Sequence, residues 1–164
     1  MSIHPAEAKD FHTALMTTNG GGIWDDLGWL CMADIQQVAR DASKALKKFG
    51  LSSNEPVLTP VGGRAEDISA ILAVIDAGGV AVPFHRKSHQ VTRSNLESAS
   101  SARVVLSTPD HEKRSTPSLI RISETLPPER PLLDGAAIIT YTSGSTGKAK
   151  GVVLSRNKIS AKLD

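Results

Sequence analysis

A short segment of the sequence combines glycine, lysine and hydroxyl side chains at close spacing. Residues 141–153 read YTSGSTGKAKGVV. Gly144 and Gly147 allow positive φ and a close approach of the backbone, so successive N–H groups can form a concave site for an anion. Hydrogen-bond donors and positive charge come from Thr142, Ser143, Ser145, Thr146, Lys148 and Lys150. The pattern therefore predicts a phosphate-binding loop.

Two other chemical interpretations of this segment fail on spacing. A Walker A loop needs glycine six residues before its lysine and Ser or Thr after it, but Thr142 and Ala149 hold those positions around Lys148. A Ser-x-x-Lys acyl enzyme built on Ser145 and Lys148 would also need Ser-Asp-Asn and Lys-Thr-Gly motifs, which the sequence lacks. A flexible linker is the remaining alternative, and the β-rich runs 136–141 and 151–155 on either side disfavour it.

The elements that must position the loop alternate between helix and strand. An apolar stripe predicts a helix over 34–49, with Asp34 as N-cap and Gly50 after its end. A second helix over 65–77 is apolar nearly all round, as expected of a buried helix, and a weaker one covers 89–100. Strands are predicted at 56–61, 80–84, 103–107 and 119–122. This order favours an α/β fold, a layered and largely parallel sheet flanked by helices.

Composition excludes several classes of protein. The hydrophobic fraction of 40%, the charged fraction of 22% and the net charge of +2 are typical of a globular domain and argue against nucleic-acid or membrane partners. Cys31 is the single cysteine, so we expect a buried, inert thiol, a reducing compartment and a cytoplasmic protein. His85 and His89 lack a third ligand, so no metal site is expected.

Three further features have structural interpretations. Lys44, Lys47 and Lys48 are expected to form the solvated face of the first helix. Trp24 and Trp29 are expected to pack an N-terminal arm, residues 1–31, onto the adjoining domain at 32–164. Solvation at a helix end is expected to account for Asp76.

The segment YTSGSTGKAKGVVLS closely resembles the phosphate-binding signature of the adenylate-forming (AMP-binding) superfamily, Y-T-S-G-S-T-G-x-P-K-G-V. That superfamily includes acyl- and aryl-CoA synthetases, luciferases and the adenylation domains of peptide synthetases. Ala149 departs by replacing Pro, and Arg156 stands where the family often has His. The region from Met32 onward also resembles the family's opening elements, including its A-G-G-x-x-V-P turn at 77–83. The resemblance implies the N-terminal subdomain of the adenylate-forming synthetase fold, truncated.

In that family, ATP and a carboxylic acid give an acyl-adenylate and pyrophosphate, and a thiol, commonly that of coenzyme A, then takes the acyl group. ATP and Mg²⁺ are the implied cofactors, coenzyme A the implied co-substrate and a carboxylic acid the implied partner. By position, the family's phosphate-binding role falls on Thr142, Ser143, Gly144, Ser145, Thr146, Gly147 and Lys150. Lys148 sits at the variable position and is expected to be ancillary.

The family's catalytic residues proper have no counterpart within the sequence, so the chain alone is not expected to form adenylates. Ala81 and His85, where peptide synthetases carry Tyr and Asp, favour an acyl- or aryl-CoA synthetase over an amino-acid adenylation domain. A non-catalytic binding or interaction module of the same origin stays open as an alternative. Because the predicted sheet looks unfinished, we also expect self-association through its edge.

Overall fold

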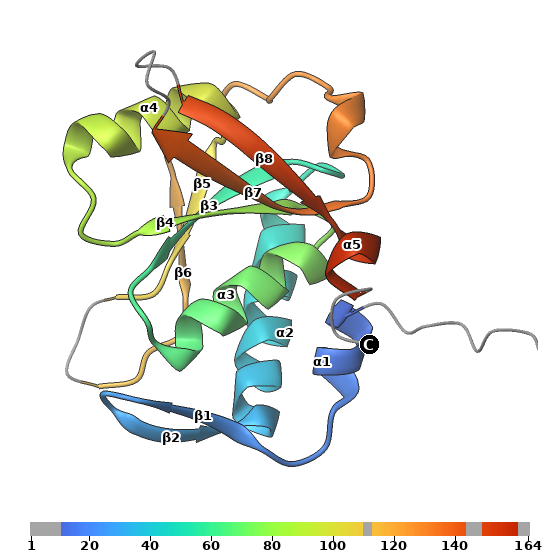
Figure 1. The fold of residues 1–164 in the computed structure, drawn as a ribbon, viewed down its shortest axis with the longest axis vertical. Helices are drawn as coiled ribbons and strands as arrows, with labels where there is room; N and C mark the ends of the chain where they lie inside the picture. The colour runs from blue at the N-terminus through green and yellow to red at the C-terminus, as the bar shows by residue number, and fades with distance from the viewer. Residues whose placement is uncertain (1–10, 110–112, 144–148, 161–164) are drawn as a thin grey trace, which may run out of the picture.

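The computed structural model describes residues 11–109, 113–143 and 149–160 (Figure 1). Its elements in chain order are α1 Phe11–Thr17, β1 Gly22–Asp25, β2 Gly28–Cys31, α2 Met32–Phe49, β3 Pro56–Val61, α3 Ala65–Asp76, β4 Val80–His85, α4 Gln90–Ser100, β5 Val104–Ser107, β6 Ser118–Arg121, a short 3-10 helix Pro131–Leu133, β7 Ala136–Ser143, β8 Ala149–Ser155 and α5 Arg156–Ser160. The predicted alternation of helices and strands is confirmed, with boundaries that shift by one or two residues.

A six-stranded sheet in the order β6-β5-β3-β4-β7-β8 forms the centre of the molecule. The inner strands β5, β3, β4 and β7 are parallel, whereas β6 and β8 pair antiparallel to their neighbours at the two edges. A separate antiparallel hairpin, β1–β2, lies below the sheet in Figure 1. The largely parallel α/β sheet predicted from the sequence is therefore confirmed.

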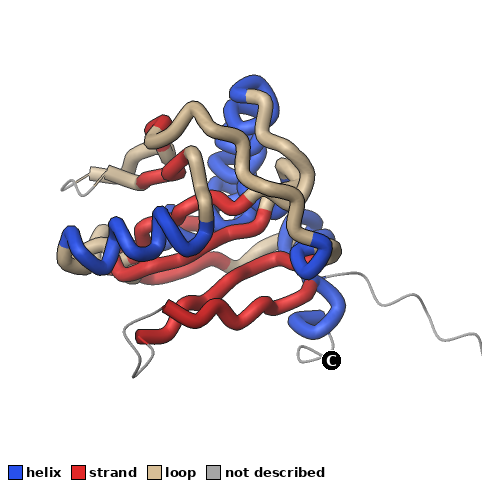
Figure 2. The backbone as a smooth tube through the Cα atoms, turned by 90° about the horizontal axis from the view of Figure 1, so that it is seen from above, coloured by secondary structure: helices blue, strands red, loops and turns tan. Residues whose placement is uncertain are grey.

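Helices cover both faces of the sheet (Figures 1 and 2). On one face, α2 and α3 pack against inward-facing strand residues such as Val57, Ala81 and Val104. On the other, Leu96 of α4 and Leu133 of the 123–135 segment pack against Leu58, Val82 and Val105. Burial on both faces explains why these strands are nearly continuous apolar runs.

The first long helix follows its apolar stripe. Ile35, Ala39, Ala42 and Leu46 recur at steps of three or four and are buried against α3 and the sheet. The helix ends where Gly50 adopts φ +82°, a left-handed conformation that suits glycine. The predicted N-cap was wrong, because the helix begins at Met32 and Cys31 takes the cap position. Asp34 lies instead in the first turn, where its carboxylate accepts the Cys31 thiol at 3.0 Å.

The turn after α3 requires glycine for two different reasons. Gly78 has φ +85°, which other residues rarely adopt. A side chain on Gly79 would come within 2.9 Å of Leu51 and 3.0 Å of the Glu55 carbonyl oxygen. The pair therefore lets α3 turn tightly into β4.

The N-terminal segment packs differently from the expectation. Trp24 and Trp29 are 74% and 48% exposed and lie against each other, with ring centroids 6.0 Å apart, so their predicted role in packing was wrong. Ile23, Leu30, Leu15 and Met16 make the apolar contacts to the core instead. Because Trp24 and Trp29 are next to Ile23 and Leu30 on the two strands of the hairpin, their side chains lie on the opposite face, away from the domain.

Two smaller expectations also need correction. Cys31 is only half-buried, not fully buried. Asp76 is more than a solvated helix end, since its carboxylate accepts the Ser43 hydroxyl at 2.5 Å and pairs with Lys47 at 3.2 Å. These contacts join the end of α3 to α2.

Candidate functional site

The carboxyl ends of the four parallel strands meet at one edge of the sheet, and ligands of open α/β sheets bind at such edges. Strands β3, β4, β5 and β7 end there at Val61, His85, Ser107 and Ser143. The residues immediately after each strand decide whether that position is available to a ligand.

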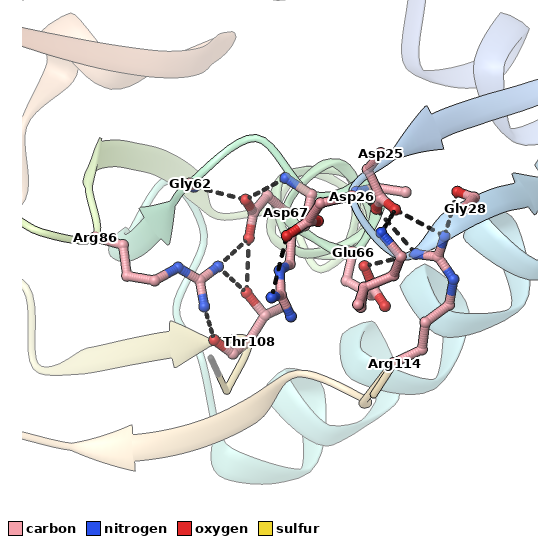
Figure 3. A network of polar contacts seen from close by, with 12 residues as sticks. Asp25, Asp26, Gly28, Gly62, Glu66, Asp67, Arg86, Thr108 and Arg114 are labelled. Carbon is pink, nitrogen blue, oxygen red and sulfur yellow. Dashed lines mark hydrogen bonds and ion pairs between the residues drawn. The ribbon is translucent and has the colours of Figure 1, made fainter. Parts of the chain in front are cut away.

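A buried polar network occupies the ends of β3, β4 and β5 (Figure 3). Asp67, in the first turn of α3, accepts hydrogen bonds from the backbone N–H groups of Gly62 at 2.7 Å and Arg64 at 3.0 Å. Its other oxygen accepts the Thr108 hydroxyl at 2.7 Å and the Arg86 guanidinium at 2.5 Å. Arg86 also donates to the carbonyl and hydroxyl oxygens of Thr108. We call these five residues the Asp67 network.

This network fills the position that an anion would take. The N–H groups after β3 point at an acceptor, as they do in phosphate sites, but the acceptor is the chain's own carboxylate. Asp67 is 3% exposed and Arg86 13%, and each satisfies the other's charge. The chain's own side chains therefore occupy the ends of these three strands, and the Asp67 carboxylate and the Arg86 guanidinium are paired with each other.

A second cluster joins the β1–β2 hairpin to α3. The Asp25 carboxylate, fully buried, accepts two bonds of 2.9 Å from Arg114 and one of 2.9 Å from the Ala65 N–H. Arg114 also donates to the Gly28 carbonyl at 2.6 Å and to Glu66 at 3.1 Å. The hydrogen bonds from Arg114 lower the pKa of Asp25 to about 2, although burial opposes the shift. This cluster anchors the hairpin and, like the Asp67 network, has a structural role.

The end of β7 differs, because it leads into the predicted phosphate loop. β7 and β8 form an antiparallel hairpin in which Thr142 lies opposite Lys150 and Ser143 opposite Ala149. The side chains of Thr142 and Lys150 are exposed at the base of the loop. The loop is thus succeeded by a strand, as the sequence predicted, so no helix dipole contributes to anion binding there.

The structure tests this prediction only in part. Of the predicted phosphate-binding residues it describes Thr142 and Lys150 fully and Ser143 as backbone. Gly144, Ser145, Thr146 and Gly147, together with Lys148, lie outside the described residues. Thr142 and Lys150 are brought together by the strand register and supply one hydroxyl and one positive charge, which suits a polyphosphate.

A hollow lies beside the loop-bearing hairpin. It has a volume of about 470 Å³ and is lined by Ile139, Tyr141, Gly151 and Val153 from the hairpin and by Ala99 and residues 129–133 from across it. Burial raises the pKa of Tyr141, and the nearby Arg130 opposes part of that shift. The lining is mostly apolar, with Glu129 and Arg130 as its charged residues.

Residues 11–109, 113–143 and 149–160 contain no group of three His, Cys, Asp or Glu side chains placed to hold a metal ion. His85 Nδ1 accepts the Lys87 N–H at 3.2 Å, so this ring nitrogen is engaged within its own turn. None of the helices in the described part of the chain is both long and apolar enough to cross a membrane.

Sequence reasoning missed the Asp67 network. Its members come from loops after three strands and from one helix, and the bonded pair Asp67 and Thr108 are 41 positions apart. A usable signal was present, since Arg86 and Thr108 come within two residues of the predicted strands 80–84 and 103–107, where a polar side chain reaches the carboxyl edge. Arg156 was noted only as a departure from the family pattern, and its guanidinium donates to the Ile75 carbonyl at 3.1 Å near the end of α3.

With this geometry in view, comparison with known proteins decides the family. The family of AMP-binding enzymes matches residues 6–164. The chain belongs to the AMP-binding enzyme family. The resemblance inferred from the loop and the upstream elements is thereby confirmed across nearly the whole chain.

Similar sequences within the AMP-binding family include a peptide synthetase and a CoA ligase. Nonribosomal peptide synthetase 4 of Gibberella zeae is 30% identical over 147 residues, 80% of this chain and 2% of the synthetase. The malonate–CoA ligase of Arabidopsis thaliana is 30% identical over 123 residues, 60% of this chain and 20% of the ligase.

Solved structures agree in fold with this AMP-binding chain. ATP-bound MatB of Rhodopseudomonas palustris superposes with a TM-score of 0.67 at 19% identity, over 93% of this chain and 36% of MatB. The N-terminal subdomain of Klebsiella oxytoca NpsA, in complex with 3-hydroxyanthranilyl-AMSN, gives 0.63 at 20% identity, over 92% and 40%. The α/β fold is therefore that of N-terminal subdomains of adenylate-forming enzymes, and the chain spans less than half the length of these relatives.

Proposed function

We propose that this chain is the ATP-phosphate-binding part of an AMP-forming ligase, which activates a carboxylic acid as its adenylate and transfers the acyl group to coenzyme A. On this proposal Thr142, Ser143, Gly144, Ser145, Thr146, Gly147 and Lys150 hold the β- and γ-phosphates of ATP. The observation that carries it is the pairing of Thr142 with Lys150 at the base of the loop, at the end of a central parallel strand. The Asp67 network supports it indirectly, because it closes the neighbouring strand ends.

Each residue type has a distinct part in phosphate binding. Lys150 offsets negative charge as pyrophosphate leaves, and the Thr142 hydroxyl donates to a phosphate oxygen. On this proposal Mg²⁺ arrives bound to the phosphate oxygens of ATP. We also propose a cytoplasmic location, in keeping with the single cysteine.

Binding of the nucleotide phosphates can be tested on the chain itself. We expect Lys150→Gln to weaken the binding of ATP about tenfold, the lower end for a lost charged hydrogen bond at an exposed site. Lys44→Gln is the matched control, since Lys44 is an exposed lysine on α2 whose nearest acid is Asp41 at 3.4 Å. Titration calorimetry with Mg²⁺–ATP measures both. Equal affinities of the two variants would contradict the assignment of the loop.

Adenylate formation is a property of a longer protein on this proposal. We expect no ATP-dependent hydroxamate from the chain alone with any carboxylic acid, whereas a protein that continues past Asp164 should exchange pyrophosphate with its cognate acid. A strong hydroxamate signal from the chain alone would refute the proposal that adenylate formation needs a longer protein.

An amino-acid adenylation domain of a peptide synthetase is a second candidate. The match to the Gibberella zeae synthetase over 80% of this chain favours it, whereas the malonate–CoA ligase favours a coenzyme A acceptor. The thiol that accepts the acyl group separates the two candidates. Transfer to coenzyme A supports the AMP-forming coenzyme A ligase, and transfer only to the thiol of a carrier protein supports the amino-acid adenylation domain.

A further inference from the structure

The base of the phosphate loop contains an aromatic residue that lies across a glycine. Tyr141 and Gly151 are directly opposite each other in the β7–β8 hairpin, one pair before Thr142 and Lys150. A Cβ atom on Gly151 would lie 3.1 Å from Cε1 and 3.3 Å from Cζ of the Tyr141 ring, and 3.1 Å from Cγ2 of Ile139. The ring therefore rests on the flat backbone of its cross-strand partner.

Backbone conformation does not explain the glycine. Gly151 is absent from the described glycines with positive φ, so its φ and ψ are accessible to any residue. A side chain at this position would instead meet the Tyr141 ring. The contact thus accounts for a glycine in the middle of a strand, where glycine otherwise costs stability.

The loop end of the hairpin lies beyond the register pair that joins β7 to β4. That pair is Ala81 opposite Ile138, near the start of both strands. In Figures 1 and 2 the loop end of β7 and β8 lies apart from the carboxyl end of β4. On the face of the hairpin that carries Tyr141, contacts to the buried apolar cluster also support this end.

Arg130 connects this face of the hairpin to α4, because it interacts with the Tyr141 side chain and with the end of that helix. Its guanidinium donates to the Ala99 carbonyl at 3.3 Å and to the Ser101 hydroxyl at 2.8 Å, both at the end of α4. It lines the same hollow as Tyr141, which packs with Ile139 and Val153 against the core on this face. The tyrosine thus lies between its glycine partner and a residue that is fastened to α4.

We propose that Tyr141 is a positioning residue for the phosphate loop, with Gly151 as the surface on which its ring rests and Arg130 as its link to α4. The inference rests on the proposed phosphate-binding function. It predicts that the ring fixes the last strand pairs, so that Thr142 and Lys150 meet the ligand without a prior rearrangement.

Hydrogen exchange of the hairpin amides tests, without any ligand, whether the Tyr141 ring stabilises the last strand pairs. We expect Tyr141→Val to speed exchange at the pairs nearest the loop about two- to fivefold, the range of an aromatic cross-strand pair, and Tyr141→Phe to change it little. Gly151→Ala should also speed exchange, because the added methyl group displaces the Tyr141 ring. Its effect should be smaller in a chain that already carries Tyr141→Val, since that chain has no ring to displace. Arg93→Gln, which removes an ion pair on α4 to Glu97, is the control.

Binding of inorganic tripolyphosphate to the same variants tests the consequence. We expect Tyr141→Val to weaken binding by about the factor found in exchange, and Tyr141→Phe to keep near wild-type affinity. Faster exchange with unchanged affinity would reduce Tyr141 to a structural residue and overturn the proposal. So would wild-type exchange in both Tyr141→Val and Gly151→Ala. If the wild-type chain binds no tripolyphosphate, the proposed phosphate-binding function is refuted. Hydrogen exchange then still decides whether Tyr141 stabilises the end of the hairpin.

Discussion

Substitution of Asp67 by asparagine tests the claim that the strand ends beside the loop are closed by a charge-balanced network. All four neighbours of this carboxylate are donors: two backbone N–H groups, the Thr108 hydroxyl and the Arg86 guanidinium. An amide has one acceptor oxygen and one NH₂ group. Whichever way the Asp67→Asn amide points, its NH₂ group faces donors, and the charge of Arg86 loses its partner.

The magnitude depends on burial. Breaking a buried ion pair by removing one partner costs about 3–5 kcal/mol, and each orphaned donor adds to that cost. Arg86 is 13% exposed, so water reaches part of it and the lower half of the range applies. We therefore expect a loss of about 3–4 kcal/mol, which a domain with a stability of about 5–15 kcal/mol survives at 25 °C.

Urea unfolding monitored by circular dichroism at pH 7 measures this change. Tryptophan fluorescence is a poor probe here, because both indole rings are already exposed in the folded state. Glu97→Gln is the control, since it removes a half-exposed i,i+4 pair with Arg93 and should cost no more than about 0.5 kcal/mol. Replacing the three interacting side chains together, as Asp67→Leu, Arg86→Met and Thr108→Val, should recover much of the loss.

A loss from Asp67→Asn as small as that from Glu97→Gln would refute the reasoning. It would mean that the two N–H groups and the guanidinium find other acceptors, and that these strand ends are open to a ligand after all.

Two further outcomes are expected. The folded-state pKa of Asp25, about 2, lies below its usual value of 3.8, so its cluster stabilises the fold above pH 4 and loses that contribution as the pH falls toward 2. The stability difference between the wild type and Asp25→Asn should accordingly shrink by about 1–2 kcal/mol between pH 5 and pH 2. This value is smaller than the full shift in pKa would give, because solvent screens the partly exposed Arg114. An equal difference at both pH values in urea titrations would contradict this assignment. Val152 on the edge strand β8 is 51% exposed, so self-association is expected to decrease in Val152→Lys; light scattering that finds a monomeric wild type at high concentration would remove the basis for this prediction.

Much of the fold could be predicted because the signals are local. The four buried positions of α2 recur with a helical period, and Gly50 and Gly78 end their helices at the predicted places. Boundaries were less accurate, as at Asp34, because the N-cap depends on how the chain enters the helix from β2. The tryptophans were misassigned for a similar reason: a large apolar side chain carries no mark of which face of a hairpin it will occupy.

The sequence by itself determined the α/β class and the family, because period, turn residues and a contiguous motif can be read along the chain. Only the tertiary structure decided which side chains occupy the ends of β3, β4 and β5. Asp67 and Arg86 neutralise each other, and Thr108 bonds to both, only because parallel strands bring their carboxyl ends to one edge; burial then makes each charge depend on its partner. The same holds for Tyr141 and Gly151, whose contact exists only in the hairpin register.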